Sequence, residues 1–281
     1  MNKIYINGRI VSEEKAAITV FDRSYLYGEG VFETMRAYSG RPAFCDMHYH
    51  RLKGNCSRLK IDLPLDEYAF ERAVHRTINA NKLKEAYVRA TVSSVGFAMG
   101  LARPKARATN IVIFAKRLIP RPPVQYQKGI KIIIVKDVFA DDPDVAAVKS
   151  TNYLTRMIAR DEVTRAKAEE GLICNRSGMV LEGSATNLFA VKDGVLYTPP
   201  LSDGCLPGVT RWVVIGLAED MDIPLVETSI RIADIKKMDE IFLTGSTSEI
   251  LPVAEVAGIS KRKAPGPTTA RLMKAYKEIV G

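Results

Sequence analysis

Two patterns of hydrophobic residues in the first hundred positions predict local structure. Near the N-terminus, Ile4-Tyr5-Ile6 and Arg9-Ile10-Val11 flank Asn7-Gly8, a pair that strongly favours a two-residue hairpin turn. Over 66–81, apolar residues recur every four positions, at Phe70, Val74 and Ile78. This spacing predicts a helix with one face buried in a core.

The other predicted elements lie on both sides of one proline-rich break. Residues Ile119-Pro120-Arg121-Pro122-Pro123 are the best linker candidate, because clustered prolines block both a helix and a central strand. Before this break we expect a helix at 46–60 and strands at 86–95 and 109–117. After it we expect a strand at 130–138, a helix at 153–168, turns at 177–178 and 193–194, a helix at 209–221, a strand at 240–244 and a helix from about 268.

Two of these helices have a predicted buried face. The helix at 209–221 is expected to bury Val213, Leu217 and Met221, and the last helix Leu272, Tyr276 and Ile279. Helices and hairpins on both sides of the linker 119–123 predict two α/β or α+β domains, at 1–118 and 124–281.

Composition and charge narrow the class of protein. The 281 residues are 47% hydrophobic and carry 41 Lys+Arg against 32 Asp+Glu, a net charge of +9. The basic residues are scattered among acidic ones, whereas a nucleic-acid-binding protein concentrates its basic residues in one region. No apolar run reaches the ~20 residues that a membrane helix needs, and MNKIYINGRI has no apolar signal core. We expect a soluble cytoplasmic protein that binds neither nucleic acid nor membranes.

Cysteine and histidine spacing gives no metal or disulfide pattern. Cys45, Cys56, Cys174 and Cys205 form no CxxC pair, so buried reduced thiols are expected. His48 and His50 are two apart, but no third ligand is near them in the sequence. We predict no metal site.

Four polar clusters in the second half lie near predicted strand ends and turns. Lys149-Ser150-Thr151-Asn152-Tyr153 offers an amine before a helix start. Glu182, between the apolar pieces 179–181 and 188–190, is a candidate for a buried, partnered acid. Leu206-Pro207-Gly208-Val209-Thr210-Arg211 leads into a helix whose first N–H groups suit an anion. Thr244-Gly245-Ser246-Thr247-Ser248-Glu249 is a hydroxyl-rich turn with further donors for a phosphate.

These four clusters together match the demands of one cofactor. Pyridoxal phosphate needs an amine for a Schiff base, a carboxylate that keeps its pyridine nitrogen protonated, and turns with an Arg that hold its phosphate. Each cluster alone has an ordinary explanation, as a solvated lysine, a polar strand end or a helix cap. Their occurrence in this order is much harder to obtain by chance.

The same residues resemble a known family. Glu182 followed by Asn187-Leu188-Phe189, then 196–200 (LYTPP) and 206–211 (LPGVTR), closely resembles the signature of class IV aminotransferases. The resemblance extends to 27–33 (YGEGVFE), to His50-Arg51-Leu52 and to the stretch from Phe242 to Pro252, so it covers nearly the whole chain. It implies the fold-type IV architecture, with a small N-terminal α/β domain, a larger C-terminal domain with a mixed sheet or barrel, and a homodimer.

The resemblance also implies roles for single residues. Lys149 matches the Schiff-base lysine that shuttles the proton between the substrate Cα and the cofactor C4′. Glu182 matches the partner of the pyridine nitrogen. Tyr153 lies where the branched-chain members of the family have a tyrosine near the phenolic oxygen of the cofactor. The phosphate cup is matched by Arg51, Val209, Thr210, Ser246 and Thr247.

The subgroup within the family is less sharply indicated. Tyr87-Val88-Arg89 and Gly96-Phe97-Ala98-Met99-Gly100-Leu101 resemble the branched-chain L-amino-acid aminotransferases. The Arg and His expected for D-amino-acid aminotransferases are absent from 92–97, although the short spacing from Lys149 to Tyr153 resembles those enzymes. An aminodeoxychorismate lyase uses the same machinery. Lys149 and Glu182 do not distinguish these three activities, because the outcome depends on which groups the pocket places beside the intermediate.

We therefore predict an aminotransferase that moves the amino group of branched-chain L-amino acids to 2-oxoglutarate by a ping-pong mechanism. Arg89 is the candidate for the substrate carboxylate of acidic partners, and Tyr27 and Phe32 for the apolar pocket. Arg36 is a further basic candidate near it. Phe32 could equally belong to the core, and Arg36 or Arg89 to structural ion pairs. A D-amino-acid aminotransferase and aminodeoxychorismate lyase remain the alternatives.

Overall fold

The computed structural model describes residues 2–98, 100–104, 107–140 and 142–281. Met99 of the 96–101 phrase lies outside these residues. The chain divides into an N-terminal unit, Met1–Ile119 with Val148–Asn152, and a C-terminal unit, Pro120–Ala147 with Tyr153–Gly281. The division falls inside the proline-rich segment 119–123. The segment 148–152 belongs to the N-terminal unit, whereas the sequence-based prediction placed it in the domain 124–281.

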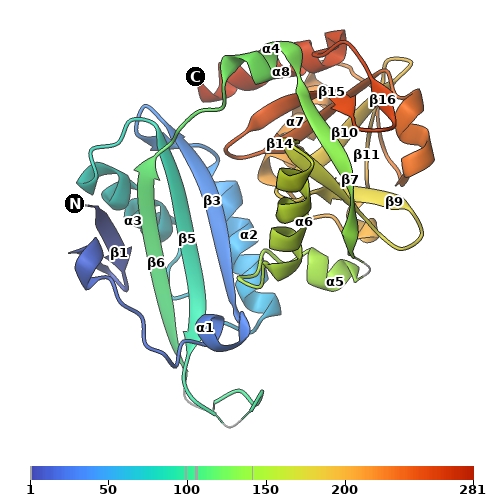
Figure 1. The fold of residues 1–281 in the computed structure, drawn as a ribbon. Coiled ribbons are helices and arrows are strands. Elements are labelled where there is room, and N and C mark those ends of the chain that lie inside the picture. The colour runs from blue at the N-terminus through green and yellow to red at the C-terminus, as the bar shows by residue number, and fades with distance from the viewer. Residues whose placement is uncertain (1, 99, 105–106, 141) are drawn as a thin grey trace. The chain divides into compact units, whose positions relative to one another are not determined.

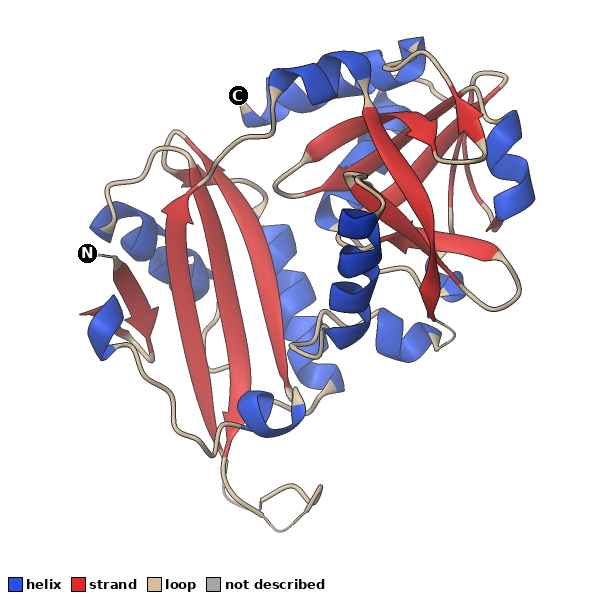
Figure 2. Cartoon of the chain, viewed as in Figure 1, coloured by secondary structure: helices blue, strands red, loops and turns tan. Residues whose placement is uncertain are grey.

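The N-terminal unit is an antiparallel sheet whose long helices cover one face (Figures 1 and 2). Within the described residues the sheet has six strands in the order β2-β1-β6-β5-β3-β4. They are β1 (Lys3–Ile6), β2 (Arg9–Ser12), β3 (Gly30–Tyr38), β4 (Arg41–Pro42), β5 (Ala86–Val95) and β6 (Ala108–Arg117). The helices are α1 (Arg23–Tyr27), α2 (Cys45–Arg58) and α3 (Glu67–Ala80), and a 3-10 turn spans Glu13–Lys15.

Local chemistry explains these elements. The predicted hairpin is confirmed, with Ile6 paired to Arg9 across the Asn7-Gly8 turn. Helix α3 begins where the Asp66 carboxylate accepts a bond from the Ala69 amide at 2.7 Å, which satisfies one of the free N–H groups of its first turn. Its predicted stripe of Phe70, Val74 and Ile78 is fully buried.

Alternation along the strands gives this sheet two different faces. Val31, Met35 and Ala37 of β3 pack with Val88, Ala90 and Val92 of β5 in one core, under α2 and α3. The intervening residues, such as Phe32 and Arg89, point to the opposite face, because successive strand residues alternate.

The C-terminal unit is built on a mixed sheet of ten strands within the described residues. These are β7 (Ile130–Phe139), β8 (Glu170–Cys174), β9 (Met179–Gly183), β10 (Asn187–Lys192), β11 (Val195–Thr198), β12 (Leu225–Glu227), β13 (Ile230–Arg231), β14 (Glu240–Gly245), β15 (Glu249–Val256) and β16 (Ser260–Lys261). The helices are α4 (Pro123–Lys128), α5 (Pro143–Ala146), α6 (Leu154–Arg165), α7 (Val209–Asp220) and α8 (Pro267–Val280) (Figure 1), with 3-10 turns at Leu201–Asp203 and Ile232–Lys237.

The sheet closes on itself like a barrel. Its order is β12-β11-β10-β14-β15-β7-β8-β9-β13, and β9 also pairs with β10 through Glu182 and Asn187. The closed ring thus runs through β10, β14, β15, β7, β8 and β9. Each ring strand contributes a fully buried apolar residue to one cluster: Ile132, Leu172, Val180, Leu188, Leu243 and Leu251. This architecture is the mixed barrel that the sequence predicted for the second domain.

Two predicted helix faces are partly wrong. Helix α7 buries Val214, Leu217 and Ala218, whereas Val213 and Met221 are only half-buried. Its sequence is apolar on several sides, so a four-residue spacing alone does not identify the packed side. In α8, Leu272 and Tyr276 are buried as predicted, but Ile279 in the last turn is 53% exposed.

His48 and His50 contact different glutamates, and the four cysteines are buried. His48 is buried against Glu33, while exposed His50 lies 3.3 Å from Glu67, so the two rings have different partners. Cys45, Cys56, Cys174 and Cys205 are buried free thiols. Among the described residues, no helix combines the length and the apolar character that crossing a membrane requires.

Candidate active site

The segment that carries Lys149 lies as a short extra strand along the start of β3. The Phe32 amide donates to the Lys149 carbonyl at 3.0 Å, and the Thr151 amide donates to the Gly30 carbonyl at 2.8 Å. The Thr151 hydroxyl donates to the Gly28 carbonyl at 2.9 Å. These bonds are the physical reason that 148–152 belongs to the N-terminal unit, against the prediction.

Two glycines make room for this segment. Gly28 has a φ of +70°, and a Cβ there would lie 2.9 Å from the Cβ of Asn152. A Cβ at Gly30 would lie 3.1 Å from the Thr151 hydroxyl. The phrase Gly28-Glu29-Gly30 is not a nucleotide fingerprint. It is the surface on which the segment carrying Lys149 docks.

The Lys149 ammonium lies beside an aromatic ring that a second cation also contacts. Phe32 is 3% exposed, and Lys149 Nζ is 4.7 Å from its ring centroid. The Arg89 guanidinium carbon is 3.6 Å from the same centroid. Such contacts are favourable because the ring face carries negative charge density. The structure therefore brings together three predicted residues, Lys149, Phe32 and Arg89.

Arg51 is held by a buried carboxylate on the helix side of β3. Glu33 has no exposed surface. Arg51 donates to it through Nε at 2.8 Å and Nη2 at 2.6 Å, and His48 Nδ1 lies 2.7 Å from the same carboxylate. A fork of two N–H bonds fixes the plane of a guanidinium. The predicted phosphate ligand is thus oriented by Glu33 and His48, which sequence reasoning did not single out as functional residues.

Burial and ion pairing compete at this cluster. Burial raises the pKa of the Glu33 carboxyl, but Arg51 and the hydrogen bond with His48 outweigh it and lower that pKa to about 2. Burial lowers the pKa of His48 by more than Glu33 raises it. At neutral pH the cluster therefore contains a carboxylate, a guanidinium and a neutral imidazole, whose Nδ1–H donates to Glu33.

The two other substrate candidates have local partners. Arg36 is 3.1 Å from the Glu85 carboxylate and lies over the Tyr38 ring at 4.3 Å. Tyr27 ends α1, is 40% exposed, and has the Arg23 guanidinium 4.8 Å from its ring centroid. Arg36 thus has an acidic and an aromatic neighbour.

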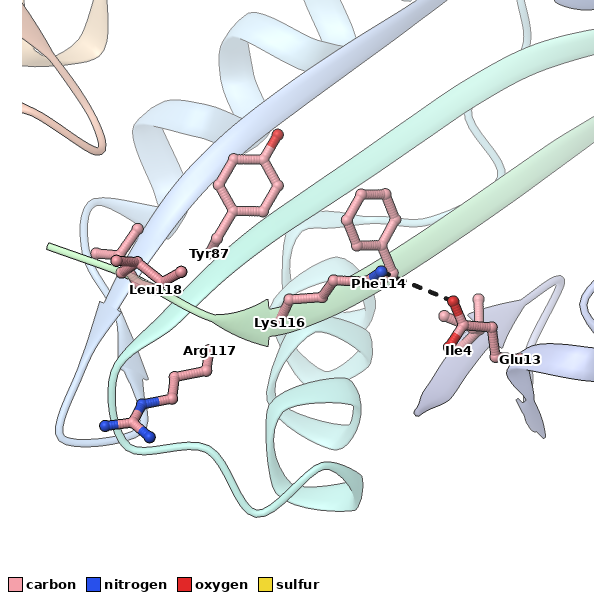
Figure 3. A pocket seen from close by; sticks show the side chains of 8 residues that line it. Ile4, Glu13, Tyr87, Phe114, Lys116, Arg117 and Leu118 are labelled. Carbon is pink, nitrogen blue, oxygen red and sulfur yellow. Dashed lines mark ion pairs between the residues drawn. The ribbon is translucent and has the colours of Figure 1, made fainter. Parts of the chain in front are cut away.

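A hollow elsewhere on the N-terminal unit contains none of the predicted residues (Figure 3). Tyr87 and Phe114 stack in it at 6.1 Å, and Lys116 pairs with Glu13 at 3.7 Å. Ile4, Arg117, Leu118 and Ile119 complete its lining. Its basic residues are exposed or already paired, so the chemistry points to the Lys149 cluster instead.

In the C-terminal unit, Glu182 lies at the seam that closes the barrel. It is 4% exposed. Its Oε2 accepts bonds from the Leu206 amide at 3.0 Å and from Asn187 Nδ2 at 3.2 Å, and Oε1 accepts a bond from Arg156 Nη2. Asn187 also donates to the Leu206 carbonyl at 2.8 Å. Glu182 is thus the buried, partnered acid that its position between apolar strands suggested.

The start of α7 has the properties of an anion site. Gly208 precedes the helix without a side-chain cap, and Asn187 occupies the place that a Cβ at Gly208 would take. Val209 and Thr210 in the first turn are 1% and 2% exposed. Among the described residues, the buried Thr210 hydroxyl has no hydrogen-bond partner. Free amides, the positive end of the helix dipole and this hydroxyl together suit a phosphate.

The remaining predicted ligands lie on neighbouring segments of this unit. Ser246 and Thr247 are half-buried in the turn between β14 and β15. A Cβ at Gly245 would lie 3.5 Å from the Ala185 carbonyl, so this turn approaches the one that follows Glu182. Tyr153 precedes α6, with the Arg156 guanidinium 5.7 Å from its ring centroid.

Three of the four predicted clusters therefore meet in the C-terminal unit, while the first is divided between Lys149 and Tyr153. Sequence reasoning missed Glu33, His48 and Arg156. Glu33 had a signal, because it is a carboxylate at an inward position of an apolar strand. His48 had one too, since it lies three residues before Arg51 on a predicted helix. Arg156 had none, because its partner is 26 residues away.

A sequence profile decides the family. The profile of the family described as Amino-transferase class IV matches residues 30–256. This chain belongs to the class IV aminotransferases. It is therefore an enzyme, a transaminase, and the resemblance given by the Glu182 and Leu206–Arg211 motifs is confirmed.

The class IV relatives span several activities. The chain is 39% identical to a putative branched-chain-amino-acid aminotransferase of Methanocaldococcus jannaschii, over 99% of this chain and 96% of the relative. It is 28% identical to a D-alanine aminotransferase of Staphylococcus epidermidis, over 100% and 98%. It is 30% identical to an aminodeoxychorismate lyase of Bacillus subtilis, over 98% and 94%.

Solved structures of class IV enzymes share the fold. The branched-chain amino acid aminotransferase of Escherichia coli superposes with a TM-score of 0.93 at 29% identity, over 99% of this chain and 94% of that one. The T.th. branched-chain amino acid aminotransferase, solved with pyridoxamine 5'-phosphate, gives 0.92 at 28% identity, over the same shares. The fold-type IV prediction is confirmed.

Pyridoxal phosphate is the cofactor of this family, and the residues of this chain fit it. The unpartnered Thr210 hydroxyl and the uncapped start of α7 suit its phosphate. The buried Glu182 carboxylate suits a protonated ring nitrogen. Lys149 supplies an amine on a segment that the backbone fixes in place.

Proposed function

We propose that this class IV aminotransferase transfers the amino group of branched-chain L-amino acids to 2-oxoglutarate in a ping-pong cycle. The observation that carries the proposal is the cluster around Phe32, with Arg89 and Lys149 both against its ring. One cluster thus provides an amine, a guanidinium for a carboxylate and an aromatic wall. An amino acid with an apolar side chain presents the matching groups.

Lys149 and Glu182 perform the central tasks in this proposal. Pyridoxal phosphate, when bound, supplies an electron-accepting ring that makes the proton on the substrate Cα removable. Lys149 would hold the cofactor covalently until the substrate amine displaces it, and the amine freed in this way would move that proton between Cα and C4′. Glu182, buried and bonded to Arg156, would accept the N–H of the pyridine ring and keep the ring able to accept electrons.

The other residues hold the cofactor. Arg51, oriented by Glu33, pairs with the phosphate, and the first amides of α7 with the Thr210 hydroxyl bind its other oxygens, beginning at Val209. Ser246 and Thr247 add donors from their turn. Tyr153 would donate a hydrogen bond to the phenolic oxygen of the cofactor and help to keep it charged.

Substrate recognition follows from the same face of the sheet. Arg89 binds the carboxylate of the acidic partner, glutamate or 2-oxoglutarate. Phe32 and Tyr27 form the apolar pocket, and Arg36 adds positive charge near it. The higher identity to the putative branched-chain relative, 39% against 28% and 30% for the other two activities, supports this choice. We further propose a homodimer in the cytoplasm.

The half-reaction with single amino acids tests the proposal. The protein loaded with pyridoxal phosphate is mixed with L-leucine in one cuvette and D-alanine in another, and the absorbance of the cofactor is followed. Conversion to the amine form by L-leucine alone is expected. Conversion by D-alanine alone would overturn the branched-chain proposal in favour of a D-amino-acid aminotransferase. Release of pyruvate from aminodeoxychorismate without amine transfer would identify a lyase.

Lys128→Ala is a matched control for Lys149→Ala in the same assay. Lys128 is an exposed lysine at the end of α4, so its loss should leave the half-reaction unchanged. If Lys149→Ala converted L-leucine at the rate of the unaltered protein, Lys149 would not be the amine that this mechanism requires.

A further inference from the structure

Arg156 donates hydrogen bonds to Glu182 and to the turn that follows it. Its Nη2 donates to Glu182 Oε1, and its Nη1 donates to the carbonyls of Gly183 and Ser184 at 3.1 and 3.2 Å. The side chain is 18% exposed, against 5% for Glu182. One guanidinium on α6 therefore fixes both the orientation of this carboxylate and the backbone beside it.

The charges around this pair come from several elements. Glu170 of β8, 2% exposed, accepts bonds from the Ser184 amide and hydroxyl. Tyr153 precedes α6, and Cys205 lies before α7, where burial raises the pKa of its thiol to about 12. Arg211 of α7 is paired with Glu227 at 2.5 Å. Arg156 is thus the cation in direct contact with Glu182 among the described residues of this unit.

We infer that Arg156 tunes the acceptor strength of Glu182, so that Glu182 holds the proton of the cofactor's pyridine nitrogen less tightly than an unpaired carboxylate would. This inference rests on the proposed role of Glu182. Burial opposes the charge of Arg156, but Glu182 outweighs burial and raises the pKa of the guanidinium. The positive charge is therefore permanent at every pH at which the enzyme works.

The expected consequence follows from electrostatics. A proton shared by the pyridine nitrogen and Glu182 is repelled by a fixed positive charge next to Glu182. Removing that charge should make the proton leave only at higher pH. Arg156 is a positioning and tuning residue, since it acts through Glu182 and not on the substrate.

The test is a pH titration of the ring nitrogen, observed by ¹⁵N NMR with ¹⁵N-labelled pyridoxal phosphate bound to the enzyme. The pH at which half of the nitrogen has lost its proton in the unaltered protein is the reference midpoint. In Arg156→Gln the midpoint should rise by at least about one unit, the size of effect that one close charge produces. Arg156→Lys keeps the charge and should restore the original midpoint.

A second arginine of α6 serves as the control. Arg160 donates to the Glu169 carbonyl at 2.6 Å and is exposed, so Arg160→Gln should leave the titration unchanged. Equal midpoints in Arg156→Gln and the unaltered protein would overturn the inference, and so would a nitrogen that stays protonated to pH 10 in both.

Glu182→Gln separates this inference from the proposed function. If Glu182→Gln shifts the nitrogen but Arg156→Gln does not, only the role of Arg156 fails. If Glu182→Gln does not shift it, Glu182 is not the partner of the pyridine nitrogen and its proposed role fails. If Arg156→Gln does not fold, Arg156→Met takes its place, and a midpoint equal to that of Arg156→Lys would overturn the inference, because the charge would then have no effect.

Discussion

In each unit one buried glutamate among the candidate site residues is paired with an arginine, Glu33 with Arg51 and Glu182 with Arg156, and the two pairs present opposite charges. In the N-terminal unit Glu33 is fully enclosed, and Arg51, 8% exposed, is the outer partner. In the C-terminal unit Glu182 is bonded by the Leu206 amide and Asn187 as well as by Arg156. The first pair holds an arginine for an anion, and the second holds a carboxylate for a cation.

This difference shows that a buried Glu–Arg ion pair can prepare a site for either an anionic or a cationic group of a ligand. A buried ion pair contributes little net stability, because desolvation offsets its attraction. What it does provide is a charged group in a fixed orientation. Pyridoxal phosphate has an anionic phosphate at one end and a basic nitrogen at another, and we propose that the Arg51 pair serves the first and the Glu182 pair the second.

The largest expected effect comes from removing the Lys149 amine, because neither ion pair can supply an amine in its place. Lys149→Ala should lower turnover by at least about 10³-fold, the scale of losing a positioned general base. Some non-covalent binding of pyridoxal phosphate should remain, because both pairs are intact. Turnover and reduction of the bound cofactor by borohydride measure the two effects. Unchanged borohydride trapping would place the covalent bond on another lysine.

Breaking the first pair should cost stability in a pH-dependent way. Glu33→Gln leaves Arg51 as a buried charge without its partner, at a cost of about 3 kcal/mol or more in the free energy of unfolding. The pKa of Glu33 is lowered from 4.5 to about 2 on folding. Its contribution is therefore complete above pH 4.5 and is lost as the pH falls toward 2.

Urea unfolding of both proteins from pH 7 to pH 2 measures this effect. The difference between Glu33→Gln and the unaltered protein should shrink steadily below pH 4.5. Glu85→Gln is the control, because its bond to Arg36 is exposed and such pairs contribute about 1 kcal/mol or less. A difference for Glu33→Gln that stays constant with pH would show that Glu33 is not ionised in the folded protein.

A smaller effect is expected at the phosphate end of the C-terminal unit. Thr210→Val removes a buried hydroxyl that has no partner among the described residues, so folding should be unaffected. The dissociation constant of pyridoxal phosphate should rise roughly ten-fold, the value of one hydrogen bond to a charged group. Ser94→Ala, which removes an unpartnered buried hydroxyl of the N-terminal unit, should not change it. Equal affinities in all three proteins would remove Thr210 from the phosphate cup.

The smallest effect concerns the packing that joins Glu182 to α7. Gly208→Ala places a methyl group where the Asn187 side chain lies and should lower the melting temperature, since overpacking costs about 1–3 kcal/mol. Gly216→Ala on the same helix meets no atom within 4 Å and should raise it slightly, by helix propensity. A Gly208→Ala protein as stable as the Gly216→Ala protein would contradict the close contact with Asn187.

The sequence predicted the elements whose signal is local. The Asn7-Gly8 hairpin, the buried stripe of α3 and the two long strands 86–95 and 109–117 follow from spacing and turn chemistry over a few residues. The strand β3 was not predicted, although it carries Phe32 and Glu33. The segment 249–252, which belongs to the stretch from Phe242 to Pro252 that resembles the family, is the beginning of β15 and includes Pro252.

Features that depend on distant contacts were not predictable in the same way. The segment 148–152 lies far along the chain from β3, and nothing in its composition shows that it pairs there. Arg156 meets Glu182 only because α6 packs beside the seam of the barrel. The roles proposed for Lys149 and Glu182 come from the resemblance to the family and not from their surroundings in the sequence.

Binding of the cofactor with and without its phosphate tests the central comparison most directly. Dissociation constants of pyridoxal phosphate and pyridoxal are measured for the unaltered protein, Glu33→Gln and Glu182→Gln. We predict that Glu33→Gln weakens the binding of pyridoxal phosphate by at least ten-fold, about 1.4 kcal/mol, and leaves pyridoxal unchanged. Glu182→Gln should weaken both by the same factor. If Glu33→Gln weakened pyridoxal equally, its pair with Arg51 would not serve the phosphate, and the division of roles between the two pairs would be wrong.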